Sequence, residues 1–142
     1  MSFSEIKPYF RARLKTVGGL SEWVDAFNED NIPANKLDRG WHLLFEQGAA
    51  VSHTQPCLTY SVPVALSVYF KGFNKPANAI DMALEKLDAI LKEVLKHSNR
   101  LTQPSIKNVL STSWELNPIA DDNDNTVKLT MRFDVQVILE IG

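Results

Sequence analysis

The sequence predicts an α/β (α+β) fold in which a mixed, mainly antiparallel sheet of four to five strands is flanked by an N-terminal helix and a long amphipathic helix. Two stretches, residues 58–70 and 127–141, place apolar residues at every second position, as a strand with one buried face does. Between them, residues 77–97 repeat apolar residues at the three- and four-residue spacings of an amphipathic helix. We expect the 142 residues to form a single domain, 1–142.

The first helix is expected over residues 4–15, with Ser2 or Ser4 as its N-cap. Its apolar residues recur every four positions: Ile6, Phe10 and Leu14. Three basic residues occupy its later turns, and we interpret them as a solvated face or a contact to an acidic partner: Arg11, Arg13 and Lys15.

The segment after this helix is less regular. Residues 20–27 fit a helix or a strand equally well. Residues 28–40 are rich in Asn and Asp and contain a proline, which predicts a loop. Residues 41–45 are then expected to form a strand that stops near Gly48.

The two alternating stretches predict unusually long strands. Each could run about 14 residues, whereas strands average about 5–6. A strand longer than a small core requires must project beyond that core or pair with something outside the monomer. Pro63 lies within the first stretch and has no N–H, so it predicts an edge strand or a bulge at that point.

The long helix is expected to cover one face of the sheet, a reading we favour over a coiled coil, and Asn78 is a candidate for its N-cap. Its apolar stripe consists of Ile80, Leu84, Leu87, Leu91 and Val94. Residues 106–116 predict a weaker strand, and residues 121–125 a polar turn. On that strand one face is expected to carry Ile106, Leu110, Trp114 and Leu116.

Composition argues against several classes of protein. The 15 Lys and Arg against 17 Asp and Glu leave a formal charge of −2, which disfavours a nucleic-acid-binding module. Cys57 is the single cysteine, so the chain is not a disulfide-stapled secreted scaffold. With no 18-residue apolar run and no signal-like N-terminus, we expect a cytosolic chain without a membrane anchor.

Candidate chemistry is sparse. His53 and Cys57 could meet across a loop, but a nucleophilic pair needs a third, orienting group, so we favour a chance pairing. The acidic run 121–124 lacks the EF-hand register and indicates a solvated hairpin tip. The pair Gly18-Gly19 does not follow a strand and is not a phosphate loop. We therefore predict no enzyme activity, no catalytic or metal-ligating residues and no cofactor.

The outer face of the last strand carries charges of both signs. Its candidate subunit-interface residues are Lys128, Arg132, Asp134 and Glu140. They could serve solubility alone, or they could set the register between identical subunits, where opposite charges select orientation. In the second case a charge reversal at Arg132 or Asp134 should weaken assembly without unfolding the monomer.

The order of elements resembles the tail terminator (tail completion) proteins of long-tailed bacteriophages over nearly the whole chain. The local features that carry the resemblance are Ile32-Pro33, then Leu37-Asp38-Arg39 and a strand opening with Trp41 and His42. This resemblance implies a small protein that forms a hexameric ring, caps the tail tube, stops its polymerisation and joins tail to head. The family has no catalytic residues, so none are carried over.

The resemblance sets the expected partners. They are further copies of the chain in a homohexamer, the tail tube protein and a head–tail connector or neck protein, with no membrane and no specific nucleic acid. The expected location is the virion tail, assembled in the host cytoplasm. Two alternatives remain open: a head-closure or neck adaptor protein, and a small cytosolic ligand-binding domain.

Overall fold

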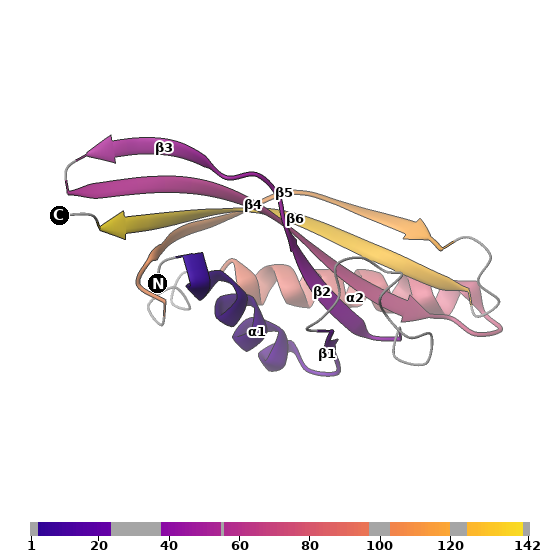
Figure 1. Ribbon diagram of the computed structural model, residues 1–142. Coiled ribbons are helices and arrows are strands. Elements are labelled where there is room, and N and C mark those ends of the chain that lie inside the picture. The colour runs from indigo at the N-terminus through magenta and orange to yellow at the C-terminus, as the bar shows by residue number, and fades with distance from the viewer. Residues whose placement is uncertain (1–2, 24–37, 55, 97–102, 120–124, 141–142) are drawn as a thin grey trace.

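The computed structural model describes residues 3–23, 38–54, 56–96, 103–119 and 125–140. The helical elements are a short 3-10 turn, η1 (Phe3–Glu5), and the helices α1 (Ile6–Val17) and α2 (Pro76–Val94). The strands are β1 (Ser21–Glu22), β2 (Gly40–Phe45), β3 (Ala49–Thr54), β4 (Cys57–Lys71), β5 (Ile106–Pro118) and β6 (Thr126–Glu140). Both helices lie on the same face of a twisted sheet (Figure 1).

The described strands form one six-stranded sheet in the order β1-β2-β4-β6-β5, with β3 also paired to β4. Only the β1–β2 pair is parallel. The predicted fold class, a mixed and mainly antiparallel sheet with an N-terminal helix and a second helix, is confirmed. The sheet has six described strands, one more than the upper end of the predicted four to five, because β3 was not expected. Residues 20–27, which fitted a helix or a strand equally well, contain β1, so Ser21–Glu22 are a strand.

The two long strands pair with each other along their entire lengths, from Cys57↔Glu140 to Lys71↔Thr126. This confirms both stretches as strands within the described residues, but β4 has more than the one expected buried face, because Ala65, Ser67 and Tyr69 are buried too. On the other side of β4, β3 pairs with its first part and β2 with its last part. The predicted loop is described only from residue 38 and the polar turn only at residue 125.

Pro63 does not lie at a sheet edge, contrary to the first of its two expected settings. Its carbonyl accepts a hydrogen bond from the Glu46 N–H at 2.9 Å, in the interval where β2 has ended and β3 has not begun. Because the N and O of an extended residue face the same neighbour, the missing N–H also faces this interval. The proline therefore lies where the hydrogen-bonded ladder is interrupted. This meets the reason for the prediction, which is that proline has no N–H to donate to a neighbouring strand.

The core lies between the helices and the sheet. α1 buries Ile6, Phe10 and Leu14 as predicted, and the Phe10 and Phe133 rings meet with centroids 5.4 Å apart. Tyr9 is also buried, and its hydroxyl donates to the Val94 carbonyl at the end of α2, with an O···O distance of 2.6 Å. This bond joins the start of one helix to the end of the other.

The expected helix caps are wrong where the structure describes them. Ser4 lies inside η1 and Asn78 inside α2, while the N-cap positions are Glu5 and Lys75, neither with a side-chain cap bond. The 3-10 turn η1 leads directly into α1, and α2 starts with Pro76. A proline there has no N–H to satisfy and has φ already suited to a helix. Ser2 is outside the described residues.

The buried stripe of α2 differs from the predicted one. Its buried residues are Ala79, Ala83, Leu87, Ile90 and Val94, whereas Ile80 and Leu84 are 41% and 43% exposed. Alanines near the start of the helix face the sheet and allow a close approach. The larger side chains one position later consequently lie on the flank of the helix.

The apolar face predicted for β5 is also wrong in part. Ile106 and Val109 are buried, but Leu110 and Trp114 are 45% and 48% exposed. The register of β5 on β6 shifts twice, between Ile106 and Asn108 and between Ser111 and Ser113. The first shift turns Leu110 to the helix-free face, and the second returns Trp114 and Leu116 to the helix side, so one period-two face does not persist along the strand.

Candidate subunit interface

The four predicted interface residues lie on the helix-free face of β6, which is an interior strand between β4 and β5. The residues that alternate with them along β6, such as Met131 and Phe133, point to the opposite face and are buried under the helices. Lys128 lies over the Tyr69 ring, with 6.0 Å from its Nζ to the ring centroid. Glu140 lies at the far end of β6, opposite Cys57, and is remote from the other three.

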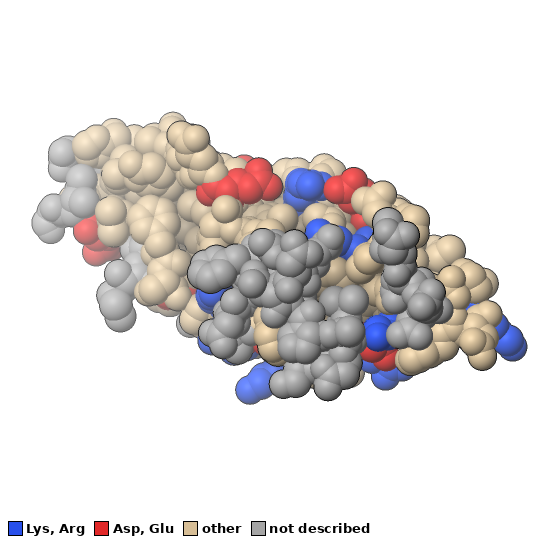
Figure 2. Space-filling view, turned by 45° about the vertical axis from the view of Figure 1, so that its right-hand side comes forward, with Lys and Arg blue, Asp and Glu red and all other residues tan. Residues whose placement is uncertain are grey.

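Arg132 and Asp134 bind groups of their own chain. The Arg132 Nη1 donates to Glu115 Oε1 on β5 at 3.0 Å, and its Nε is 3.9 Å from Glu46 Oε1. Asp134 accepts a hydrogen bond from the Ser61 hydroxyl on β4. Figure 2 shows that basic and acidic side chains also lie next to one another elsewhere in the view, for example along its upper rim. A charge reversal at Arg132 would therefore disturb the monomer as well, so the interface role of these residues stays a prediction.

The Arg132–Glu115 pair yields a pH prediction. The hydrogen bond from Arg132 lowers the pKa of the Glu115 carboxyl, and the Asn117 side chain adds to the effect. Because the folded pKa lies below the unfolded one, the pair stabilises the fold above the ordinary glutamate pKa. That contribution is lost as the pH falls through the lowered value. Arg132→Gln should raise the Glu115 pKa towards its ordinary value in an NMR titration of the side-chain carboxyl.

The control for this titration is Lys92→Gln on α2, which removes an exposed cation that pairs with Asp88. It should leave the Glu115 pKa unchanged. If Glu115 titrates at the ordinary pKa in the unsubstituted protein, the ion pair does not persist in solution.

The basic residues of α1 are largely engaged. Arg11 binds Glu22 of β1 through two hydrogen bonds, of 2.5 Å from Nε and 3.1 Å from Nη2, and this interaction raises the pKa of Arg11. Arg13 is buried, with its guanidinium 5.0 Å above the Tyr9 ring. Lys15 is exposed, as expected of a solvated face, whereas the burial of Arg13 shows that this interpretation is wrong for Arg13.

His53 and Cys57 do not form a pair. In the β3–β4 hairpin His53 is opposite Leu58 and Cys57 is opposite Thr54, so the two side chains point to opposite faces. Within the described ranges, no group of three or more His, Cys, Asp and Glu residues could hold a metal ion. No helix in that part of the chain is both long and apolar enough to cross a membrane.

One end of the sheet projects beyond the helices as an arm, made of β3, residues 57–61 of β4 and residues 136–140 of β6 (Figure 1). The apolar side chains on it are incompletely covered: Val51 is 55% exposed, and Leu58 and Leu139 are half-buried. This is the projection that the strand lengths predict. Near its base, the Phe3 ring meets Tyr60 edge to face at 5.5 Å.

Two strands leave a long backbone edge open. Among the described residues β3 pairs only with β4, and β5 pairs only with β6. β3 and residues 108–114 of β5 contain no Asp, Glu, Lys, Arg or Pro. Natural proteins usually protect such edges with charges or prolines, because unpaired N–H and C=O groups recruit further strands. Here the available protection is limited to bulges in each strand.

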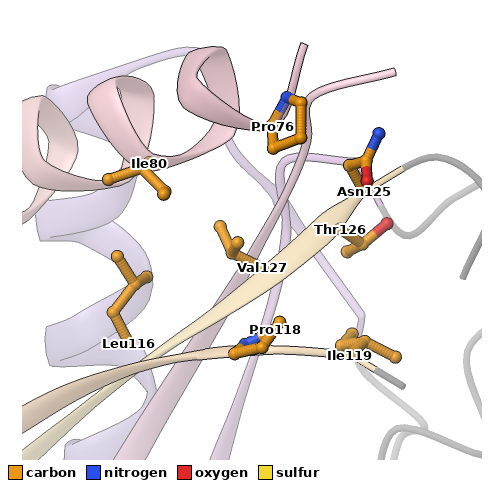
Figure 3. Close-up of a pocket in the computed structure, with 8 residues that line it drawn as sticks. All are labelled: Pro76, Ile80, Leu116, Pro118, Ile119, Asn125, Thr126 and Val127. Carbon is orange, nitrogen blue, oxygen red and sulfur yellow. The ribbon is translucent and has the colours of Figure 1, made fainter. Parts of the chain in front are cut away.

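An apolar surface adjoins the open edge of β5. We call it the α2–β5 flank: Ile80 and Leu116 line the same pocket, Leu84 follows Ile80 by one helical turn, and Trp114 precedes Leu116 by two residues on the same face of β5. Trp114 and Leu116 pair with Met131 and Leu129 and therefore point to the helix side of the sheet. At the end of this flank lies a pocket of about 240 Å³ (Figure 3). Its apolar lining comes from Pro76, Ile80, Leu116, Pro118, Ile119 and Val127.

Sequence reasoning missed both β3 and the flank. The stretch Ala49–Thr54 has no period-two alternation, and only the Gln55-Pro56 step between it and the next strand indicated a hairpin. The flank could not be found from the pattern, because Ile80 and Leu84 continue the periodicity that predicted a buried stripe.

A comparison with protein-family models and with curated protein sequences finds no match to this chain. The fold class and the surfaces described above, a projecting arm and two open edges, are therefore the observations on which a functional proposal rests.

Proposed function

We propose that this protein is a structural, non-enzymatic subunit of a closed ring, of the kind formed by the tail terminator proteins of long-tailed bacteriophages. The observation that supports it best is the sheet itself. Among the described residues, it projects beyond the helices and leaves an open edge on each of its two sides, at β3 and at residues 108–114 of β5, and apolar side chains adjoin both edges. Two different binding surfaces on one subunit are what a heterologous, ring-forming contact requires.

In this proposal six copies form the ring, as the sequence resemblance implies. The ring caps the tail tube, stops its polymerisation and offers its other side to a head–tail connector, and it resides in the virion tail. A head-closure or neck adaptor would use a similar unit, and binding to purified tail tubes would separate the two roles.

The experiment is the solution mass, measured by light scattering on a sizing column over a concentration series. We expect a species near six times 16.0 kDa, or a mass that rises from the monomer with concentration. Negative-stain electron microscopy should then show rings. A strict monomer at the highest concentration and in the presence of tail tubes contradicts the proposal.

A ligand-binding domain is the second candidate, because the pocket beside α2 is lined mainly by apolar side chains. Its volume of about 240 Å³ lies below the roughly 300–1,000 Å³ of most ligand sites. This candidate predicts a monomer whose melting temperature rises with a small apolar molecule, by mass action.

A further inference from the structure

We infer that neighbouring subunits join by strand addition, with β3 of one copy pairing to β5 of the next so that the sheet continues from subunit to subunit. This inference rests on the proposed ring and names the contact that would build it. Its basis is the position of the two open edges and the direction of the strands that carry them.

Strand direction permits the pairing. β3 and β6 both run antiparallel to β4, and β5 runs antiparallel to β6, so β3 and β5 run in opposite directions. A second copy in the same orientation therefore brings its β3 antiparallel to β5. Antiparallel pairing is the more stable arrangement per residue.

β3 and β5 lie at different positions along the length of the sheet, so pairing them requires one copy to be shifted relative to the other. β3 lies level with residues 136–140 of β6, whereas residues 108–114 of β5 lie level with residues 131–136. Pairing these stretches shifts the second copy along the strands by four to five residues, about 15 Å at 3.3 Å per residue. A sheet that closes on itself requires such a stagger, because its strands must tilt relative to the axis.

The size of the contact favours a ring over a dimer. The six residues of β3 span about 20 Å. One strand addition of this length, even with the arm covering part of the α2–β5 flank, is small beside the roughly 800 Å² per partner of a standard interface. In a closed ring each subunit makes the contact twice, once through β3 and once through β5. A complete ring is therefore stable where an isolated pair of subunits is not.

The test is disulfide trapping in a Cys57→Ser background. Ser52→Cys on β3 is combined with Ser111→Cys or with Ser113→Cys on β5, all three being exposed positions. Ser52 and Ser113 lie opposite Thr59 and Arg132 and point to the helix-free face, whereas Ser111 lies opposite Phe133 and points to the helix side. Under oxidation, the Ser52→Cys/Ser113→Cys variant should therefore give a ladder from dimer to closed hexamer on a non-reducing gel, whereas the Ser111→Cys combination and each single variant stay monomeric.

A matched pair of lysine substitutions gives an independent measurement. Val51→Lys places a charge on the open edge of β3, and Thr16→Lys places the same charge on the exposed side of α1. We expect Val51→Lys to raise the concentration needed for half-assembly at least about tenfold, equivalent to about 1.4 kcal/mol, and Thr16→Lys to leave it unchanged.

The outcomes separate the two proposals. If the protein assembles but neither double variant forms a ladder and Val51→Lys assembles normally, the strand pairing is wrong and the ring proposal stands. If the β5 cysteine variants alone give dimers, the contact is a two-fold β5–β5 pairing, which overturns the inference. A protein that stays monomeric throughout, with no crosslinks, overturns both.

Discussion

Replacing Phe10 by alanine is expected to lower the free energy of unfolding by about 3–5 kcal/mol, the usual cost of deleting a large buried side chain. Phe10 is 0% exposed at the interface of α1 with the sheet, and its ring contacts Tyr9 and Phe133. The cavity left by the ring would be bounded by the sheet and by both helices. It could close only if α1 moved, and the Tyr9–Val94 hydrogen bond opposes that movement.

Urea unfolding followed by circular dichroism measures this effect, with the denaturant slope as a check that both variants unfold alike. The matched control is Phe45→Ala, because Phe45 is 46% exposed near the end of β2. That substitution should cost well under half as much as Phe10→Ala. Equal losses for the two variants would mean that α1 does not pack on the sheet as described.

Replacing Gly72 by alanine is expected to lower the free energy of unfolding by about 1–3 kcal/mol through overpacking. Gly72 is buried in the turn from β4 to α2, where its carbonyl accepts from the Lys75 N–H at 3.0 Å. A Cβ at this position would lie 2.6 Å from the Lys75 carbonyl oxygen and 3.2 Å from the Ala79 Cβ. Lys75 is the N-cap of α2 and Ala79 lies near the start of the helix, and neither a backbone oxygen nor an alanine Cβ can rotate away, so the helix would have to shift.

The control for Gly72 is Gly48→Ala. A Cβ there would meet its nearest neighbour, the Ser61 carbonyl oxygen, at 3.4 Å, which is an ordinary contact. That substitution should change stability by less than about 0.5 kcal/mol. Thermal and urea unfolding of both variants would decide the point, and a Gly72→Ala protein as stable as the Gly48→Ala protein would contradict the tight turn.

The elements with an uninterrupted period were predictable from sequence. β4 and β6 each keep one apolar register from end to end, because they pair with each other without a register shift. The helix α1 was equally clear, since Ile6, Phe10 and Leu14 form one stripe that is buried in full. These patterns also predicted that the strands extend beyond the core.

The wrong predictions concern segments whose sequence pattern is compatible with more than one way of packing in the fold. Bulges in β5 exchange its two faces, and nothing in residues 106–116 marks where the register shifts. The charges on β6 gave a candidate interface, but other parts of the chain supply partners for them: Ser61 on β4, Glu115 on β5 and Glu46, which follows β2. Such partners cannot be read from one strand.

The sequence by itself determined the α+β class, both helices, the two long strands and their projection, because hydrophobic periodicity requires one buried face for each element. Only the tertiary structure decided which apolar residues of α2 remain exposed. Ala79 and Ala83 bring α2 close to the sheet, so Ile80 and Leu84 lie beside an open strand edge instead of in the core. The depth at which a helix packs depends on the shapes of both surfaces, and periodicity specifies only the approximate face.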